Sequence, residues 1–116
     1  YLATEQAYLA SAAVVKHRVP AKDVDLVARE VLDQVGFGKY FVHSLGHGTG
    51  LDVHEGPSLS PNSKDILLHG MVFSIEPGVY IPKVGGIRIE DLVYLKNDKA
   101  NYFAEVPTNL KDMVIK

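Results

Sequence analysis

Apolar positions recur at helical spacing through the first third of the chain. Over residues 2–18 small and apolar side chains return every three or four positions, which predicts a helix ended by Pro20. A clearer stripe over residues 23–35 predicts a second helix, and Gly36 follows it where a C-terminal cap belongs. This second stripe consists of Val24, Val27, Ala28, Val31, Leu32 and Val35.

The pattern changes after the second helix. Residues 37–61 are rich in Gly and His, whereas residues 71–94 are rich in β-branched and aromatic side chains interrupted by Gly and Pro, which predicts short strands. Further strands are expected around 101–103 and 113–115. Helices followed by a run of strands indicate an α+β fold with an antiparallel sheet. No linker divides the chain, so a single domain over residues 1–116 is expected.

The amino-acid composition limits which metal sites and binding partners the chain can have. The chain has no cysteine, which excludes disulfides and thiolate metal sites, so any metal would be held by His, Asp or Glu. A formal net charge of −2 gives no sign of a nucleic-acid or anionic-membrane surface. No apolar run approaches the roughly 20 residues that span a bilayer, and the first residues lack the basic start of a signal peptide. A cytoplasmic location is therefore expected.

The segment 43–57 is the densest in candidate chemistry. It reads HSLGHGTGLDVHEGP and sets His43, His47 and His54 among four glycines. Glycine lets the backbone approach a ligand closely, and His is the commonest metal ligand. The glycines argue against a helix, which excludes a helical HExxH zinc motif, and no helical pattern follows that would support a dinucleotide loop. Two interpretations stay open: a metal or acid–base site, and a glycine loop whose histidines are incidental. His17 and His69 lie outside this cluster and are predicted to be surface residues.

Two glutamates fall opposite each other in a predicted β-hairpin. Two apolar runs flank residues 82–86, whose sequence PKVGG is that of a turn. If the hairpin centres near Lys83, Glu76 lies opposite Glu90, and directly opposed side chains of an antiparallel pair share one face. A bulge at Pro77 would shift this register by one residue.

Like charges so placed repel, and three arrangements would offset the repulsion. Arg88 could pair with one carboxylate, one glutamate could stay protonated as a catalytic acid, or a divalent cation could bind both. A histidine from the glycine segment together with two glutamates would form a mixed nitrogen and oxygen site. Such ligand sets suit Mn, Co, Zn or Fe in the divalent state.

The two segments carry a pair of sequence signatures in order. The first is GHGTGLDVHEGP from Gly46 to Pro57, and the second is EPG from Glu76 followed by GGIRIED from Gly85 to Asp91. Together they resemble the pita-bread metallopeptidases of the Xaa-Pro dipeptidase (prolidase) and aminopeptidase P family, over almost the whole chain. The resemblance implies an α+β chain, two helices packed on an antiparallel sheet. Residues 1–116 would form the C-terminal part of the catalytic domain, with its N-terminal half missing.

The resemblance also implies a ligand set. His47 would ligate one metal through a ring nitrogen, Glu76 would ligate the same metal, and Glu90 would bridge two divalent ions, expected to be Mn, Co or Zn. Such ions lower the pKa of a shared water and stabilise charge on the attacked carbonyl. The family's site also needs two aspartates from an upstream strand pair, and residues 1–20 contain none. The chain alone is therefore expected to bind one ion or none and to be inactive.

Catalytic roles follow from the same resemblance for His43, His54, Glu76 and Arg88. Glu76 would move a proton to or from the nucleophile, and His54 would steady the scissile carbonyl. His43 would contact substrate nearby, and Arg88 would hold a carboxylate ligand. The expected substrate is a short peptide with proline after the scissile bond. The intact protein is expected to be a homodimer that binds neither nucleic acid nor membrane.

Two other functions are compatible with this fold. One is a peptide-binding pita-bread module without catalysis, and the other is a creatinase-like hydrolase that works without metal. The opposed glutamates favour the metallopeptidase, because a binding module has no need for them. Dipeptidase and aminopeptidase P activities are equally compatible with the sequence.

Overall fold

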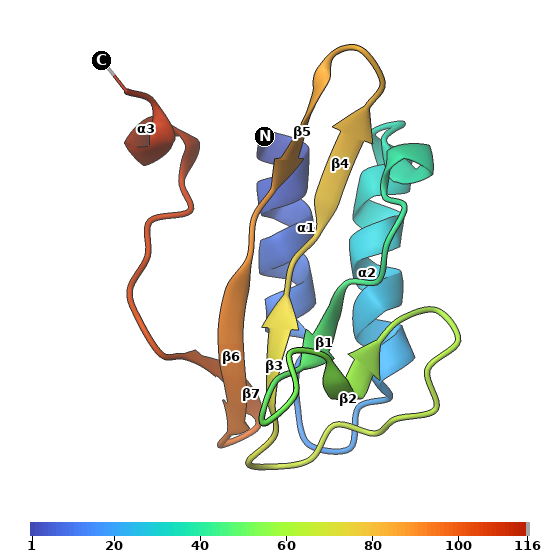
Figure 1. The fold of residues 1–116 in the computed structure, drawn as a ribbon, viewed down its shortest axis with the longest axis vertical. Helices are drawn as coiled ribbons and strands as arrows, with labels where there is room; N and C mark the ends of the chain where they lie inside the picture. The colour runs from blue at the N-terminus through green and yellow to red at the C-terminus, as the bar shows by residue number, and fades with distance from the viewer. Residues whose placement is uncertain (116) are drawn as a thin grey trace.

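A computed structural model describes residues 1–115 as two long helices and two antiparallel sheets (Figure 1). The helical segments are α1 (Leu2–Ala13), α2 (Ala21–Gln34), the 3-10 turn η1 (Gly38–Tyr40) and the short α3 (Leu110–Met113). The strands are β1 (Gly46–Gly48), β2 (Glu55–Leu59), β3 (Val72–Ile75), β4 (Gly78–Ile81), β5 (Gly85–Arg88), β6 (Asp91–Lys96) and β7 (Lys99–Tyr102). The predicted α+β class is confirmed. Within the described residues, none of the helices has the length and apolar character needed to cross a bilayer.

The larger sheet has five strands in the order β2-β1-β3-β6-β7, all antiparallel to their neighbours. Strands β4 and β5 form a separate two-stranded ribbon that continues upward from β3 and β6 in Figure 1. Helices α1 and α2 pack against each other and against the sheet, and Ala28 and Leu32 of α2 are fully buried with Phe73 and Ile75 of β3. This packing positions the strands that carry the candidate chemistry.

The predicted hairpin register is confirmed. Ile81 pairs with Gly85 across the turn, so the ribbon centres on Lys83. Ile75 pairs with Asp91 on the far side of the break between the two sheets, which is the same register. Counting along both strands therefore sets Glu76 opposite Glu90, and Pro77 introduces no shift.

Alternation along the ribbon separates two faces. Successive side chains of a strand point to opposite faces, so residues two apart share one. The odd-numbered side chains Phe73, Ile75 and Val79 are buried, and Asp91 accepts a hydrogen bond from Tyr8 of α1. The odd face is therefore the one that the helices cover. The even face holds Ser74, Glu76, Gly78, Tyr80, Gly86, Arg88 and Glu90.

The first helix is shorter than the pattern predicted. It ends at Ala13 rather than continuing toward Pro20, and Arg18 adopts a left-handed conformation with φ of 67°. The amide of Arg18 donates to the carbonyl of Leu67 at 2.7 Å, and the amide of Leu67 donates back to the carbonyl of Val19 at 2.9 Å. A pairing with a distant loop thus replaces the last helical turn. Gly36, with φ of 79°, follows the second helix as predicted.

The strand predicted at residues 113–115 is wrong. Met113 ends the short helix α3, and Asn109 caps this helix by accepting a hydrogen bond from the amide of Lys111. An asparagine at this position satisfies an amide that the first helical turn leaves free, which favours a helix start over a strand. The strand predicted around 101–103 is confirmed as part of β7.

Candidate active site

A polar pocket of about 320 Å³ gathers most of the residues that the sequence singled out. Its walls come from the segment before β1, from β1 itself, from the end of the loop before β2, from β2, and from the even face of the hairpin that runs from β3 to β6. The lining residues are His43, Ser44, Gly46, His47, His54, Ser58, Glu76 and Arg88. All four predicted catalytic residues and two of the three predicted metal ligands therefore share one pocket.

An imidazole and a carboxylate meet at the centre of this pocket. Nε2 of His47 lies 3.2 Å from Oε1 of Glu76. Nδ1 of His47 lies 2.9 Å from the carbonyl oxygen of Gly48. A carbonyl oxygen only accepts, so Nδ1 carries a hydrogen and Nε2 is the nitrogen that can bind a cation. A bare Nε2 and an ionised carboxylate are both acceptors, so the pair requires a shared cation, either a proton or a metal ion.

The donor set fits a divalent metal. Imidazole nitrogen and carboxylate oxygen bind such ions at about 2.0–2.2 Å, so two of these ligands near a right angle stand about 3 Å apart. The 3.2 Å between His47 and Glu76 agrees with this spacing. The hydrogen bond from Nδ1 of His47 to a backbone carbonyl is the usual way in which a metal-binding histidine is oriented.

Close packing of β1 on β3 brings His47 to this position. A side chain at Gly46 would overlap the backbone carbonyl of Ser74 on the facing strand, so only glycine allows the two strands to approach so closely. The segment before β1 is held by α2, because Asp25 accepts from the amide of Leu45 at 3.0 Å and Arg29 donates to the carbonyl of His43 at 2.8 Å. Asp25 and Arg29 also form an ion pair at 2.6 Å.

Arg88, Tyr80 and His43 form a second group beside the pair. Nε of Arg88 donates to the hydroxyl of Tyr80 at 2.7 Å, and Nη1 of Arg88 lies 3.6 Å from Oε2 of Glu76. Nδ1 of His43 lies 2.8 Å from the carbonyl of Ser44 and so carries a hydrogen, which leaves Nε2 to accept from the Tyr80 hydroxyl at 3.2 Å. Tyr80 therefore orients both Arg88 and His43.

Glycine makes room for the tyrosine ring. Tyr80 pairs with Gly86 across the ribbon, and a side chain at Gly86 would overlap the Tyr80 ring. Tyr80 and Arg88 occupy diagonal positions on one face of the ribbon. The residues paired with them across the ribbon are both glycines, Gly86 and Gly78. Tyr80 is not among the site residues predicted from the sequence, although its spacing of four residues from Glu76 on an alternating strand places it on the same face.

His54 reaches the pocket from the loop before β2. Its ring lies 4.3 Å from that of His47, edge to face, and the residue is exposed. His54 is therefore close to His47 in the pocket, and its predicted contact with the scissile carbonyl stays a prediction. The remaining histidines lie elsewhere: His17 is half-buried and His69 exposed, and their rings stack 4.3 Å apart.

Glu90 does not line the pocket. It shares the even face with Glu76 by register, but it is exposed. Within residues 1–115 no group of three His, Cys, Asp or Glu side chains is arranged to hold a metal ion. The structure thus brings His47 and Glu76 together and leaves the third predicted ligand, Glu90, outside their contact.

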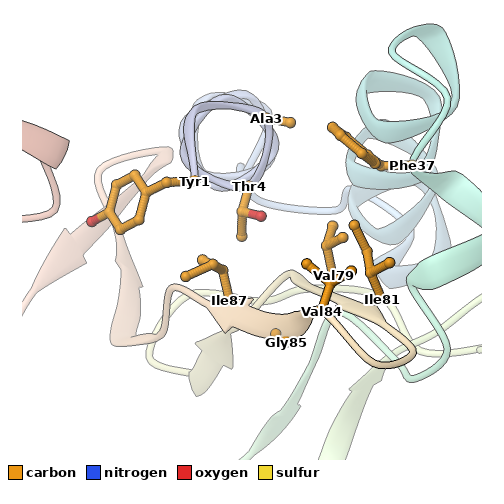
Figure 2. Close-up of a pocket in the computed structure, with 10 residues that line it drawn as sticks. Tyr1, Ala3, Thr4, Phe37, Val79, Ile81, Val84, Gly85 and Ile87 are labelled. Carbon is orange, nitrogen blue, oxygen red and sulfur yellow. The ribbon is translucent and has the colours of Figure 1, made fainter.

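A second cavity lies on the helix side of the ribbon. Figure 2 shows its walls, which come from the start of α1, from Phe37 and from the odd face of the β4–β5 ribbon. The side chains of Val79, Ile81 and Ile87 point into it from that face. None of the described residues that line it is His, Asp, Glu, Lys or Arg. The described lining of this cavity therefore has no charged or imidazole side chain, and the candidate chemistry belongs to the polar pocket.

Comparison with known proteins explains this arrangement. Residues 1–97 match metallopeptidase family M24. The chain belongs to this family. It is 46% identical over 95 residues to a Xaa-Pro dipeptidase of Pyrococcus furiosus, an alignment that covers 82% of this chain and 27% of that protein.

Solved structures of a prolidase and an X-Pro aminopeptidase have the same fold. A prolidase from Pyrococcus horikoshii superposes with a TM-score of 0.91 at 40% identity, covering 95% of this chain and 32% of that one. An X-Pro aminopeptidase from Thermotoga maritima superposes with a TM-score of 0.89 at 39% identity, covering 93% and 31%. The predicted pita-bread fold and family are confirmed. The chain spans about a third of the length of these relatives.

Removing the tyrosine hydroxyl tests the group around Arg88. We expect Tyr80→Phe in the intact protein to lower kcat for peptide hydrolysis by about 10- to 100-fold, because Arg88 and His43 lose their common partner. Binding of Mn²⁺ should change little, since the hydroxyl does not contact His47 or Glu76. Steady-state kinetics and metal titration measure both. A kcat equal to that of the unaltered protein would show that the hydroxyl orients nothing needed for turnover.

Proposed function

We propose that this chain is the C-terminal part of the catalytic domain of a metal-dependent exopeptidase that hydrolyses Xaa-Pro bonds in dipeptides or short peptides. One observation carries the proposal. Nε2 of His47 and Oε1 of Glu76 face each other at 3.2 Å with Nδ1 of His47 engaged elsewhere, an arrangement that requires a shared cation. Membership of family M24 and similarity to proteins named Xaa-Pro dipeptidase favour a metal ion over a proton.

Some residues of this site would bind metal ions. His47 and Glu76 would hold a divalent ion, with Mn, Co and Zn compatible with the nitrogen and oxygen donors. When bound, two such ions would activate a water for attack and stabilise charge on the carbonyl. Glu90 would join them as a ligand of both ions. The two aspartates that the family resemblance implies would come from outside these 116 residues.

Glu76 would act as the general acid and base of the reaction. Glu76 is 8% exposed, and both of its oxygens have partners, so the carboxylate is held in place beside the pocket, where it can accept and return a proton. Nη1 of Arg88 lies 3.6 Å from the second oxygen, Oε2, and helps to orient the carboxylate. His54, exposed beside His47, would contact the scissile carbonyl, and His43 would contact the substrate nearby.

The substrate would be a short peptide with proline after the scissile bond. The tertiary amide before proline has no N–H, so a site for it needs no acceptor for that hydrogen. The intact protein would act as a cytoplasmic homodimer, with neither nucleic acid nor membrane as a partner. A peptide-binding module without catalysis and a creatinase-like hydrolase without metal remain the alternatives. A binding module would leave the facing His47 and Glu76 without a catalytic role, whereas a creatinase-like hydrolase would have the pair share a proton.

Hydrolysis of matched dipeptides tests the proposal. The intact protein, freed of metal with a chelator and supplied with Mn²⁺, should hydrolyse Ala-Pro and leave Ala-Ala almost untouched. Chelation should remove the activity, and Mn²⁺ or Co²⁺ should restore it. The 116-residue chain alone should show no measurable turnover. Hydrolysis that survives chelation would favour the creatinase-like alternative, and no hydrolysis of any Xaa-Pro dipeptide or longer Xaa-Pro peptide would favour the binding module.

A further inference from the structure

A buried serine links the two candidate metal ligands. Ser74 of β3 is 0% exposed, and it lies two residues before Glu76 on the same face. Its Oγ accepts a hydrogen bond from the backbone amide of His47 at 3.0 Å and lies 2.7 Å from Oε1 of Glu76. One hydroxyl thus contacts the backbone of one ligand and the side chain of the other.

The direction of these hydrogen bonds is set by the groups involved. The amide of His47 can only donate, so Oγ of Ser74 accepts from it. The single hydroxyl hydrogen has two acceptors in reach, Oε1 of Glu76 at 2.7 Å and the carbonyl of His47 at 3.4 Å. The shorter contact to a carboxylate is the stronger, so the hydrogen points to Glu76. The chain of donors therefore runs from His47 through Ser74 to Glu76.

This chain closes a ring. It starts at the amide of His47, passes through Oγ of Ser74 and Oε1 of Glu76, and returns to Nε2 of His47 across the 3.2 Å gap. A shift of Glu76 along its strand would break the short hydrogen bond, and a shift of β1 would break the amide bond. The serine thus fixes the spacing at which the nitrogen and oxygen face each other.

We propose that Ser74 is a positioning residue that holds Glu76 and His47 at the separation needed to bind a divalent metal. The inference rests on the proposed function, because it assumes that the cation between them is a metal. Ser74 does not touch the metal or the substrate. It acts by limiting the rotation of the Glu76 carboxylate and by tying that carboxylate to strand β1.

Titration with Mn²⁺ tests this role directly. Calorimetry on the intact, metal-free protein should show Mn²⁺ binding weakened about 10- to 100-fold in Ser74→Ala, the usual cost of losing a group that orients a ligand. Ser74→Thr, which keeps the hydroxyl, should bind Mn²⁺ within about threefold of the unaltered protein. The pair Ser74→Thr and Ser74→Val compares hydroxyl with methyl at nearly equal shape, so it keeps the test valid if Ser74→Ala does not fold.

A second buried serine provides the control. Ser11 of α1 is also 0% exposed, and its hydroxyl donates to the carbonyl of Ala7 at 2.8 Å, away from the pocket. Ser11→Ala should leave Mn²⁺ affinity unchanged. Equal Mn²⁺ affinity in Ser74→Ala and the unaltered protein would overturn the positioning role while leaving the proposed function intact. No binding of Mn²⁺, Co²⁺ or Zn²⁺ by the unaltered protein would overturn the proposed function and this inference together.

Discussion

Glu76→Gln should reduce hydrolysis of Ala-Pro by the intact protein by about 1,000-fold or more. The substitution keeps the shape of the side chain but removes its charge and its ability to accept a proton, and the loss of general acid–base work alone costs up to about 10⁴-fold. It also places an amide beside Nε2 of His47, where the structure has a carboxylate oxygen at 3.2 Å. Steady-state kinetics at saturating Mn²⁺ measure the loss.

His47→Ala should give a loss of similar size for a different reason. The variant keeps the proton-accepting carboxylate but removes the imidazole nitrogen that faces it, so metal content should fall along with activity. Atomic absorption after gel filtration measures the bound metal. Glu30→Gln is the matched control, because Glu30 is an exposed carboxylate on α2 away from the pocket, and it should leave both quantities unchanged. Metal content in His47→Ala equal to that of the control would contradict the ligand assignment.

Glu90→Gln should reduce activity nearly as strongly as Glu76→Gln. Glu90 is exposed in this chain and lies outside the lining of the pocket, yet the strand register sets it opposite Glu76 on one face. We expect a second metal and the rest of the protein to bring Glu90 into the site. The variant should bind about half as much Mn²⁺ per chain as the unaltered protein, because a ligand shared by both ions is lost.

The measurements for Glu90→Gln are kinetics with Ala-Pro and Mn²⁺ stoichiometry by calorimetry. The Glu30→Gln variant again controls for the loss of one negative charge. Full activity with unchanged stoichiometry would remove Glu90 from the ligand set and leave His47 and Glu76 as the ligands that this chain supplies.

Local sequence is sufficient to predict the hairpin. Proline and the two glycines in PKVGG define a turn, and alternation fixes which side chains share a face once the turn is placed. This is why the pattern alone places Glu76 opposite Glu90, and why the register holds across the break between the two sheets. The glycines around His47 likewise indicate a close backbone approach, which the packing of Gly46 on Ser74 confirms.

Contacts between distant segments are beyond the sequence pattern. Ser74 lies 27 residues from His47 along the chain, and only the pairing of β1 with β3 brings the His47 amide to its hydroxyl. A serine in an apolar strand gives no signal of that partner, although its place two residues before Glu76 puts it on the right face. The same reason explains the early end of α1, since the pairing of Arg18 with Leu67 spans 49 residues.

The proposed function depends on His47 and Glu76 binding one divalent metal ion between them. Crystals of the intact protein grown with Mn²⁺, measured above and below the manganese absorption edge, would locate that ion. We expect an anomalous peak within bonding distance of both Nε2 of His47 and Oε1 of Glu76. A fully occupied manganese elsewhere, with these two atoms still facing each other without an ion between them, would contradict the assignment.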